Sequence, residues 1–354
     1  MSSVEGSINV SEGSFPARES TVLVTGGSGF VGSWAIALLL RQGYRVRTTV
    51  RNLAREQDVR AAIGSQVDPE DRLSFFAADL LRDEGWDHAV TGSDFVLHVA
   101  SPMPVGEYRK QDVVAPAREG TRRVLEASRE AGVKRVVITS SVVASMPKDE
   151  NGSPIDEGVW TDLASGKIND YSRAKTLAEK DAWDFVRSSG GKMELATILP
   201  GSIQGPVLGA DYSASIEFVG RMLKGQMPLL PRFGLAMVDV RDLVELHIRA
   251  MTSPAAAGER FIACGDFLWL SDMATILRDA LGERASKVPT RNAPDWLVRF
   301  AALFNEELRQ LTLNLGIHRA FTSAKAERLL GWHLRPAATS IVDTANSLLE
   351  RQLV

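Results

Sequence analysis

Short apolar runs alternate with helical patterns along the first two hundred residues of the chain. The first run, residues 21–25 (TVLVT), is apolar without alternation, which is typical of a strand buried on both faces of a parallel sheet. Further apolar runs predict strands over residues 44–50, 73–77, 95–99, 135–139 and 194–199. Helical spacing occurs between them, over residues 33–41, 115–131 and 171–188.

Strands joined by helical crossovers imply βαβ units. We therefore predict an α/β fold of the Rossmann type, with a doubly wound parallel sheet over residues 21–200. Beyond residue 200 the pattern changes, because residues 201–231 are rich in Gly and Pro and the chain after residue 261 is mostly helical. This part, residues 201–354, is expected to form a smaller, mostly helical domain with some chain crossing back. Residues 1–20 are expected to be a flexible extension.

Composition narrows the class of protein. Apolar residues make up 44% of the 354 residues and charged residues 24%, as in ordinary soluble proteins. The formal charge of −3 gives no reason to expect nucleic acid or a membrane surface as partner. The single cysteine, Cys264, cannot form an internal disulfide, which fits a cytoplasmic location. The five histidines show no metal spacing, so no metal is expected.

The segment TGGSGFVG, residues 25–32, follows the first predicted strand and contains two overlapping glycine spacings, TGxxGxxG and GxGxxG. Glycines at such positions allow a sharp turn, a close approach of backbone to phosphate, and close packing of helix on strand. The following helix offers unpaired N–H groups to a pyrophosphate. A Gly-rich turn without a chemical role is the alternative, but the flanking strand and helix favour a dinucleotide site. Its expected residues are Gly26, Gly29, Phe30, Val31 and Gly32.

The end of the second strand distinguishes between cofactors. An NAD site commonly places a carboxylate there, whereas an NADP site places a cation near the 2′-phosphate. This chain has Arg51 at that point, with Arg47 before and Arg55 after, and no acidic residue between residues 44 and 55. A guanidinium matches phosphate geometry, so Arg51 predicts a preference for NADP(H). Arg47 and Arg55 could equally be solvated.

Other expected cofactor contacts lie after later strands. They are Asp79 and Leu80 near the adenine, and Val99, Ala100 and Ser101, where the cofactor passes, with Thr139 at the end of the fifth strand. An Asp after a strand is often only a helix cap, which is the alternative for Asp79.

Tyr171 and Lys175 are four residues apart and therefore share one face of a helix. The ammonium is expected to lower the pKa of Tyr171 from its ordinary value of about 10 and to bind the cofactor ribose. Ser141, preferred over Ser140, would hold the substrate oxygen. Tyr171 would then donate a proton to a carbonyl oxygen while hydride reaches the carbon. A YxxxK pattern can also be an ordinary helix face, but the preceding ITSS segment favours catalysis.

Together these motifs resemble the extended short-chain dehydrogenase/reductase superfamily, in particular its dihydroflavonol-4-reductase-like branch. The resemblance covers residues 21–354 and includes VTGGSGFVGSW, VRTTVRN, LHVASPM, ITSSVV, YSRAKTLAE and LPGSIQGP. It implies NADPH, a Ser-Tyr-Lys triad, reduction of a carbonyl to an alcohol, and Pro200 and Gly201 beside the nicotinamide. The branch's flavonoid reductases carry an asparagine where this chain has Met146, which makes a dihydroflavonol a less favoured substrate than a small, largely apolar carbonyl compound.

Three functions remain open at this point. The leading one is an NADPH-dependent reductase, expected to act as a monomer or homodimer on a small or medium aldehyde, ketone or ketoester. A nucleotide-sugar epimerase or dehydratase is the second, and the missing acidic ribose contact argues against it. A non-catalytic NADP(H)-binding sensor is the third, and an intact set of Ser141, Tyr171 and Lys175 argues against that.

Overall fold

The structure is a computed structural model that describes residues 19–102, 113–148, 152–165, 168–211 and 213–354. Most of the expected N-terminal extension therefore lies outside the described residues. Ser20 is buried, and its carbonyl accepts a hydrogen bond from the Arg45 N–H.

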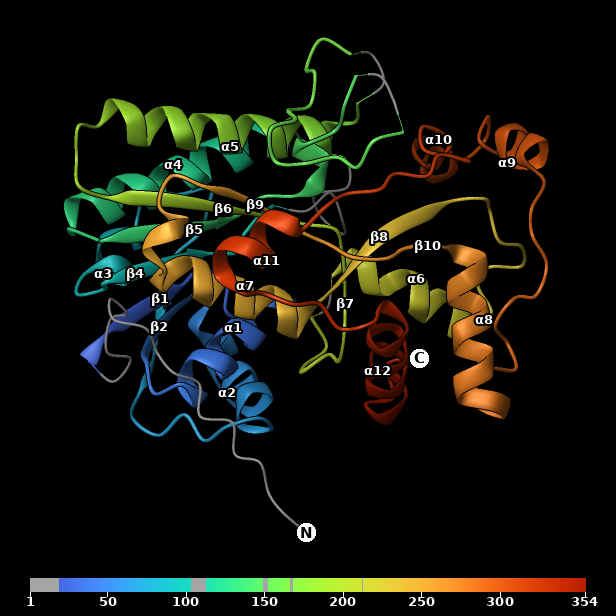
Figure 1. The fold of residues 1–354 in the computed structure, drawn as a ribbon. Helices are drawn as coiled ribbons and strands as arrows, with labels where there is room; N and C mark the ends of the chain where they lie inside the picture. Colours follow the sequence, from blue (N-terminus) through green and yellow to red (C-terminus); the bar gives the residue numbers. More distant parts are fainter. Residues whose placement is uncertain (1–18, 103–112, 149–151, 166–167, 212) are drawn as a thin grey trace.

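A seven-stranded parallel sheet forms the centre of the molecule (Figure 1). In spatial order its strands are β3 (Leu73–Ala77), β2 (Arg45–Val50), β1 (Thr21–Val24), β4 (Phe95–His98), β5 (Arg135–Thr139), β6 (Glu194–Pro200) and β9 (Arg260–Ala263). β1, β4 and β5 are buried over nearly their whole length. A strand covered on both faces has no polar side, which is why the sequence shows apolar runs there without alternation.

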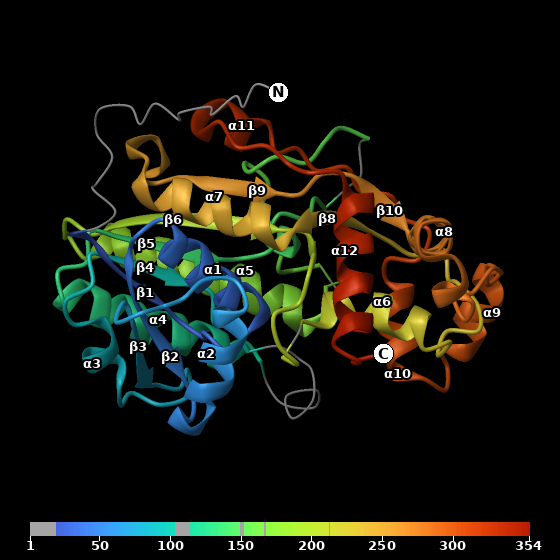
Figure 2. The ribbon, with the colours of Figure 1, turned by 90° about the horizontal axis from the view of Figure 1, so that it is seen from below.

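Helices cover both faces of this sheet, as Figures 1 and 2 show. One face carries α1 (Phe30–Arg41), α2 (Glu56–Gly64) and α7 (Val240–Thr252); the other carries α3 (Trp86–Val90), α4 (Val114–Glu130) and α5 (Asp170–Ser188). The predicted doubly wound Rossmann-type fold is confirmed. Both α7 and β9 come from the chain beyond residue 201 and complete the sheet layer.

The remaining chain lies beside the carboxyl ends of the strands (Figure 1). It contains a three-stranded sheet of β10 (Phe267–Trp269), β8 (Gly234–Asp239) and β7 (Ser202–Gln204). Its helices are α6 (Ala214–Leu223), α8 (Leu270–Leu281), α9 (Asp295–Ala301), α10 (Glu306–Thr312) and α12 (Ala337–Glu350), while α11 (Ala324–Leu330) packs on α7 and β9.

The sequence did not predict this second sheet, nor β9. β7, β9 and β10 have only three or four residues, too short to show a period, and β7 follows directly on the sheet strand β6. β8 has six residues, so its length does not explain why it was missed. The predicted helical character of the C-terminal part is confirmed by its helices.

Candidate active site

The glycine turn joins β1 to α1 at the carboxyl edge of the sheet. Gly26 has φ of +72°, a conformation that residues with a Cβ rarely adopt, and a Cβ on Gly32 would lie 2.3 Å from the Gly26 carbonyl oxygen. The turn is therefore closed to larger residues at these two positions. Gly29 is the N-cap of α1 and supplies no side-chain cap, so the first N–H groups of the helix are available to an anion.

Phe30 and Val31 begin the helix but contribute differently from the glycines. The Phe30 side chain is buried in the core, and Val31 packs against the same core. Only their backbone N–H groups can therefore face a phosphate.

The three arginines around β2 occupy different surroundings. Arg51 follows the last residue of β2 and is exposed at the carboxyl end of the strand. The Arg47 guanidinium lies 3.9 Å from the ring centre of Phe76, and its Nε donates to the Ala89 carbonyl at 2.9 Å. Arg55 forms an ion pair with Asp211 at 2.8 Å. The Arg47 side chain is thus held against α3 by these contacts.

The segment after β4 lies against the glycine turn. The strand ends at His98, one residue earlier than expected. A Cβ on Gly26 would approach that of Ala100 to 3.0 Å, and the Ala100 N–H donates to the Thr25 hydroxyl at 3.0 Å. Small residues here let the segment after β4 pack closely on the glycine turn. Val99 and Ser101 are half-buried beside Ala100.

Asp79 and Leu80 follow β3 at the same edge of the sheet. The Asp79 carboxylate accepts from the Leu81 N–H at 3.0 Å, so it shapes its own turn. Leu80 packs toward α4, where a Cβ on Gly120 would meet its Cβ at 2.8 Å. At least one carboxylate oxygen of Asp79 therefore has a structural role in its own turn, which is the alternative named above.

Ser141 and Tyr171 meet at the carboxyl end of β5. Asn169 caps α5 by accepting from the Ser172 N–H at 2.8 Å, which places Tyr171 in the first turn of the helix. Ser141 is the side chain that acts on the Tyr171 phenol, since its polar contact lowers the pKa of Tyr171 against the effect of burial. Ser140 points elsewhere, since its hydroxyl donates to Glu179 at 2.5 Å. The geometry therefore pairs the tyrosine with Ser141 and not with Ser140.

Lys175 lies one turn further along α5. Its Nζ donates to the Thr139 carbonyl oxygen at 2.9 Å, and the side chain is buried. Burial lowers the pKa of Lys175 to about 8, against the opposing influence of the Glu179 charge. The ammonium is still the main form at neutral pH.

The pKa of Tyr171 differs from the expectation. It is raised above its ordinary value because burial disfavours the phenolate, and the hydrogen bond with Ser141 offsets this only in part. The predicted lowering by Lys175 is therefore wrong. The reason is that the ammonium is directed to a main-chain carbonyl, while the half-buried phenol is partly desolvated.

Two histidines adjoin this cluster. His247 Nε2 lies 2.8 Å from the Thr139 hydroxyl, and its Nδ1 lies 2.8 Å from the Leu243 carbonyl. The carbonyl can only accept, so Nδ1 carries the proton and Thr139 donates to Nε2. His98 Nδ1 lies 2.9 Å from the Thr25 hydroxyl. The His98 side chain is buried.

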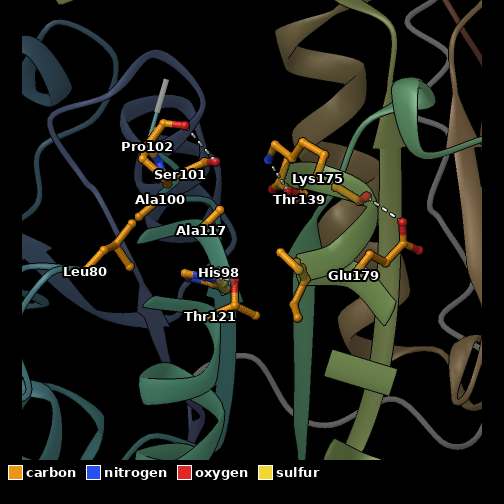
Figure 3. A pocket seen from close by; sticks show the side chains of 13 residues that line it. Leu80, His98, Ala100, Ser101, Pro102, Ala117, Thr121, Thr139, Lys175 and Glu179 are labelled. Atoms are coloured by element: carbon orange, nitrogen blue, oxygen red, sulfur yellow. Dashed lines mark hydrogen bonds between the residues drawn. The ribbon is translucent and has the colours of Figure 1, made fainter. Parts of the chain in front are cut away.

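A pocket separates the two groups of residues (Figure 3). Leu80, Ala100 and Ser101 line one wall, while Thr139 and Lys175 line the other. Lys175 and Thr139 therefore share this pocket with Leu80, Ala100 and Ser101, while the glycine turn, Arg51, Ser141 and Tyr171 lie outside its lining.

Pro200 and Gly201 close the next strand end. Pro200 is the last residue of β6, one beyond the expected strand end. A Cβ on Gly201 would lie 2.4 Å from the Ala236 carbonyl oxygen, so Gly201 allows β8 to pack closely on this edge.

Sequence reasoning missed three residues that shape the site, namely Thr25, Glu179 and His247. Glu179 had a readable signal, because it follows Lys175 by another four residues on the same helix face. Thr25 begins the TGxxGxxG spacing, but its contacts across the sheet are not readable from that spacing, and His247 had no signal in the sequence.

No group of three or more His, Cys, Asp or Glu among the described residues could hold a metal ion. None of their helices is both long and apolar enough to cross a bilayer.

Comparison with known proteins agrees with this geometry. Residues 22–264 match the NAD dependent epimerase/dehydratase family. The chain is 36% identical over 267 residues to cinnamoyl-CoA reductase 1 of Oryza sativa subsp. japonica, covering 74% of this chain and 76% of that protein. It is 34% identical to dihydroflavonol 4-reductase of Zea mays, covering 77% of each.

A solved structure supports the same assignment. Gre2 from Candida albicans, in complex with NADPH, superposes with a TM-score of 0.76 at 25% identity, over 94% of this chain and 99% of that one. The strand order, the glycine turn and these sequence matches agree, and the resemblance found in the motifs is confirmed. The chain belongs to the NAD dependent epimerase/dehydratase family, within the extended short-chain dehydrogenase/reductases.

Proposed function

We propose that this protein is an NADPH-dependent reductase that transfers hydride to the carbonyl of a small or medium aldehyde, ketone or ketoester. The observation that carries the proposal is that Tyr171 and Lys175, one turn apart on α5, lie with Ser141 at the sheet edge that also holds the glycine turn. The relatives support the reaction type, because those reported above are reductases by name.

The residues at this edge of the sheet suit a dinucleotide. The glycine turn would hold its pyrophosphate, and the exposed Arg51 would pair with the 2′-phosphate. When bound, NADPH supplies the hydride. We assign this cofactor role to residues 21–200 and the binding of substrate mainly to residues 201–354.

Tyr171 is the general acid in this proposal. Its raised pKa keeps the phenol protonated at neutral pH, so that a proton is available for a developing alkoxide. The Ser141 hydroxyl, held against Tyr171, can donate to the same substrate oxygen. Lys175, charged at neutral pH and fixed on Thr139, provides positive potential beside that oxygen.

Met146 bears on the choice of substrate. Its N–H is bound to the Thr161 hydroxyl at 2.8 Å, and its half-buried side chain offers a thioether, which is only a weak acceptor. A paired polar contact to ring hydroxyls is therefore not available from this position. We favour apolar carbonyl compounds over dihydroflavonols.

The test is NADPH oxidation with a panel of aldehydes, ketones, ketoesters and dihydroflavonols. Tyr171→Phe is expected to lower kcat by about 10²- to 10⁴-fold, the usual contribution of a general acid, while NADPH binding measured by fluorescence is retained. Tyr44→Phe is the matched control, because Tyr44 is buried before the amino end of β2. Retention of most activity in Tyr171→Phe would contradict the role. Turnover of a sugar nucleotide without net NADPH consumption would favour an epimerase.

A further inference from the structure

Glu179 is a buried carboxylate on the catalytic face of α5. It is 1% exposed, lies one turn beyond Lys175, and shares the same wall of the pocket with it (Figure 3). A buried charge is costly unless several groups satisfy it. Its partners therefore indicate what it organises.

Three side chains from three neighbouring strand segments donate to this one carboxylate. The hydroxyl of Ser140, directly after β5, donates at 2.5 Å, the hydroxyl of Thr197 in β6 at 2.7 Å, and Nε of Arg260 in β9 at 2.8 Å. Glu179 thus ties α5 to the segments of β5, β6 and β9 at three points.

Ser140 is the partner that matters for the site. It stands between Thr139, whose carbonyl accepts from Lys175, and Ser141, whose hydroxyl meets Tyr171. A side-chain bond at the middle residue restricts both neighbouring peptides. The Glu179 carboxylate, which also pairs with Arg260, therefore fixes the distance between α5 and residues 139–141.

Arg260 is itself fixed from another direction. It donates to the carbonyls of Glu157 and Val159, and its guanidinium lies 3.6 Å from the ring centre of Trp160. Because Arg260 is held independently, the carboxylate does not have to move toward it. The oxygen that accepts from Ser140 keeps its place.

We propose that Glu179 is a positioning residue, which acts through Ser140 to hold Ser141 and Lys175 in reacting geometry. The proposal rests on the proposed function, since it assumes that Ser141, Tyr171 and Lys175 carry out the proton transfer. It concerns a different measurable property, the coupling between one buried carboxylate and the turnover rate.

A matched pair of variants separates positioning from stability. Ser140→Ala and Thr197→Val each remove one buried hydrogen bond to Glu179, but only Ser140 belongs to the segment that bears the site. We expect both to lower Tm by similar amounts. We expect Ser140→Ala to lower kcat at least about tenfold, equal to about 1.4 kcal/mol, with the Kd for NADPH unchanged, and Thr197→Val to keep kcat.

A double-mutant cycle provides the second measurement. Glu179→Gln preserves size, and it is expected to lower kcat as Ser140→Ala does. The double variant is expected to lose no more than either single variant, because both break the same link. Equal kcat for Ser140→Ala and Thr197→Val, or additive losses in the cycle, would overturn the proposal. If the unmutated protein turns over NADPH and Tyr171→Phe does not, such a result would leave the proposed function intact.

Discussion

Two neutral imidazoles lie beside the candidate catalytic residues. Burial lowers the pKa of His98 to about 3, with a smaller contribution from the Lys175 charge, and burial lowers the pKa of His247 to about 4. Each ring is hydrogen-bonded to a threonine hydroxyl, Thr25 or Thr139, that borders the site. Protonating either ring would therefore require it to lose its burial or its hydrogen bond to the threonine hydroxyl.

The lowered pKa values predict acid sensitivity. The unfolded chain protonates a histidine near pH 6.5, well before the folded protein does, so stability is present at pH 7 and is lost as the pH falls toward 4. Between about pH 7 and pH 5 each histidine is expected to remove about 2 kcal/mol from the free energy of unfolding.

Urea unfolding at both pH values tests this expectation. His247→Gln should reduce the pH-dependent loss, whereas the exposed His333→Gln should not. The same loss in His247→Gln as in the unmutated protein would contradict the assignment.

Arg51 carries the prediction for cofactor choice. A hydrogen bond to a charged group contributes roughly 1.5–3 kcal/mol, so Arg51→Ala is expected to raise KM for NADPH about 10- to 100-fold. KM for NADH should be unchanged. Arg45→Ala is the control, because Arg45 is exposed at the amino end of the same strand. Equal use of NADH and NADPH by the unmutated protein would exclude the 2′-phosphate contact.

At the scale of elements, Arg135 fixes the end of α7. Its guanidinium, 4% exposed, donates to the carbonyls of Ala250, Met251 and Ser253, in the last turn of the helix and just after it, and pairs with Glu194. The last carbonyls of a helix have no partner within the helix, and a cation there also complements the helix dipole. Since α7 carries His247, this contact also supports the site.

Arg135→Met is therefore expected to destabilise the protein by roughly 2–4 kcal/mol, because several buried acceptors lose their donor together. Arg122→Met is the control, since Arg122 makes an exposed pair with Glu126 within α4. Chemical denaturation gives both values. Similar midpoints for the two variants would show that the contact contributes little.

Some elements could be predicted and others could not. β1, β4, β5 and β6 were read from apolar runs of four to seven residues, because burial on both faces leaves a mark in the sequence. β7, β8, β9 and β10 were missed. Their pairing partners lie far away in the chain, and the main chain of such short strands is stabilised by those partners and not by local preference.

At the scale of the whole molecule, one core cluster joins both parts of the fold. It contains Val22 and Leu39 from the sheet layer together with Leu277 and Leu348 from α8 and α12. Asp242 in α7 also binds Arg335, which precedes α12, with Oδ1 and Nε 2.8 Å apart. The sheet layer and the C-terminal helices therefore form one buried core, and each part would lose these buried contacts without the other.

This shared core predicts one unfolding transition. Near-ultraviolet circular dichroism and calorimetry should give coincident midpoints. NADPH at about 100 times its Kd should add about 2.7 kcal/mol to the stability of the entire chain. Two separated transitions, of which NADPH shifts only one, would show that the two parts unfold independently.

The sequence by itself determined the sheet of the Rossmann domain, the glycine turn and the tyrosine–lysine pair. These depend on local spacing: period along a strand, φ at Gly26, and one helix turn between Tyr171 and Lys175. Only the tertiary structure decided which serine meets Tyr171, where Arg47 is held, and that burial raises the pKa of the phenol. Those outcomes depend on desolvation and on partners brought from distant strands, and neither is encoded in the spacing of neighbouring residues.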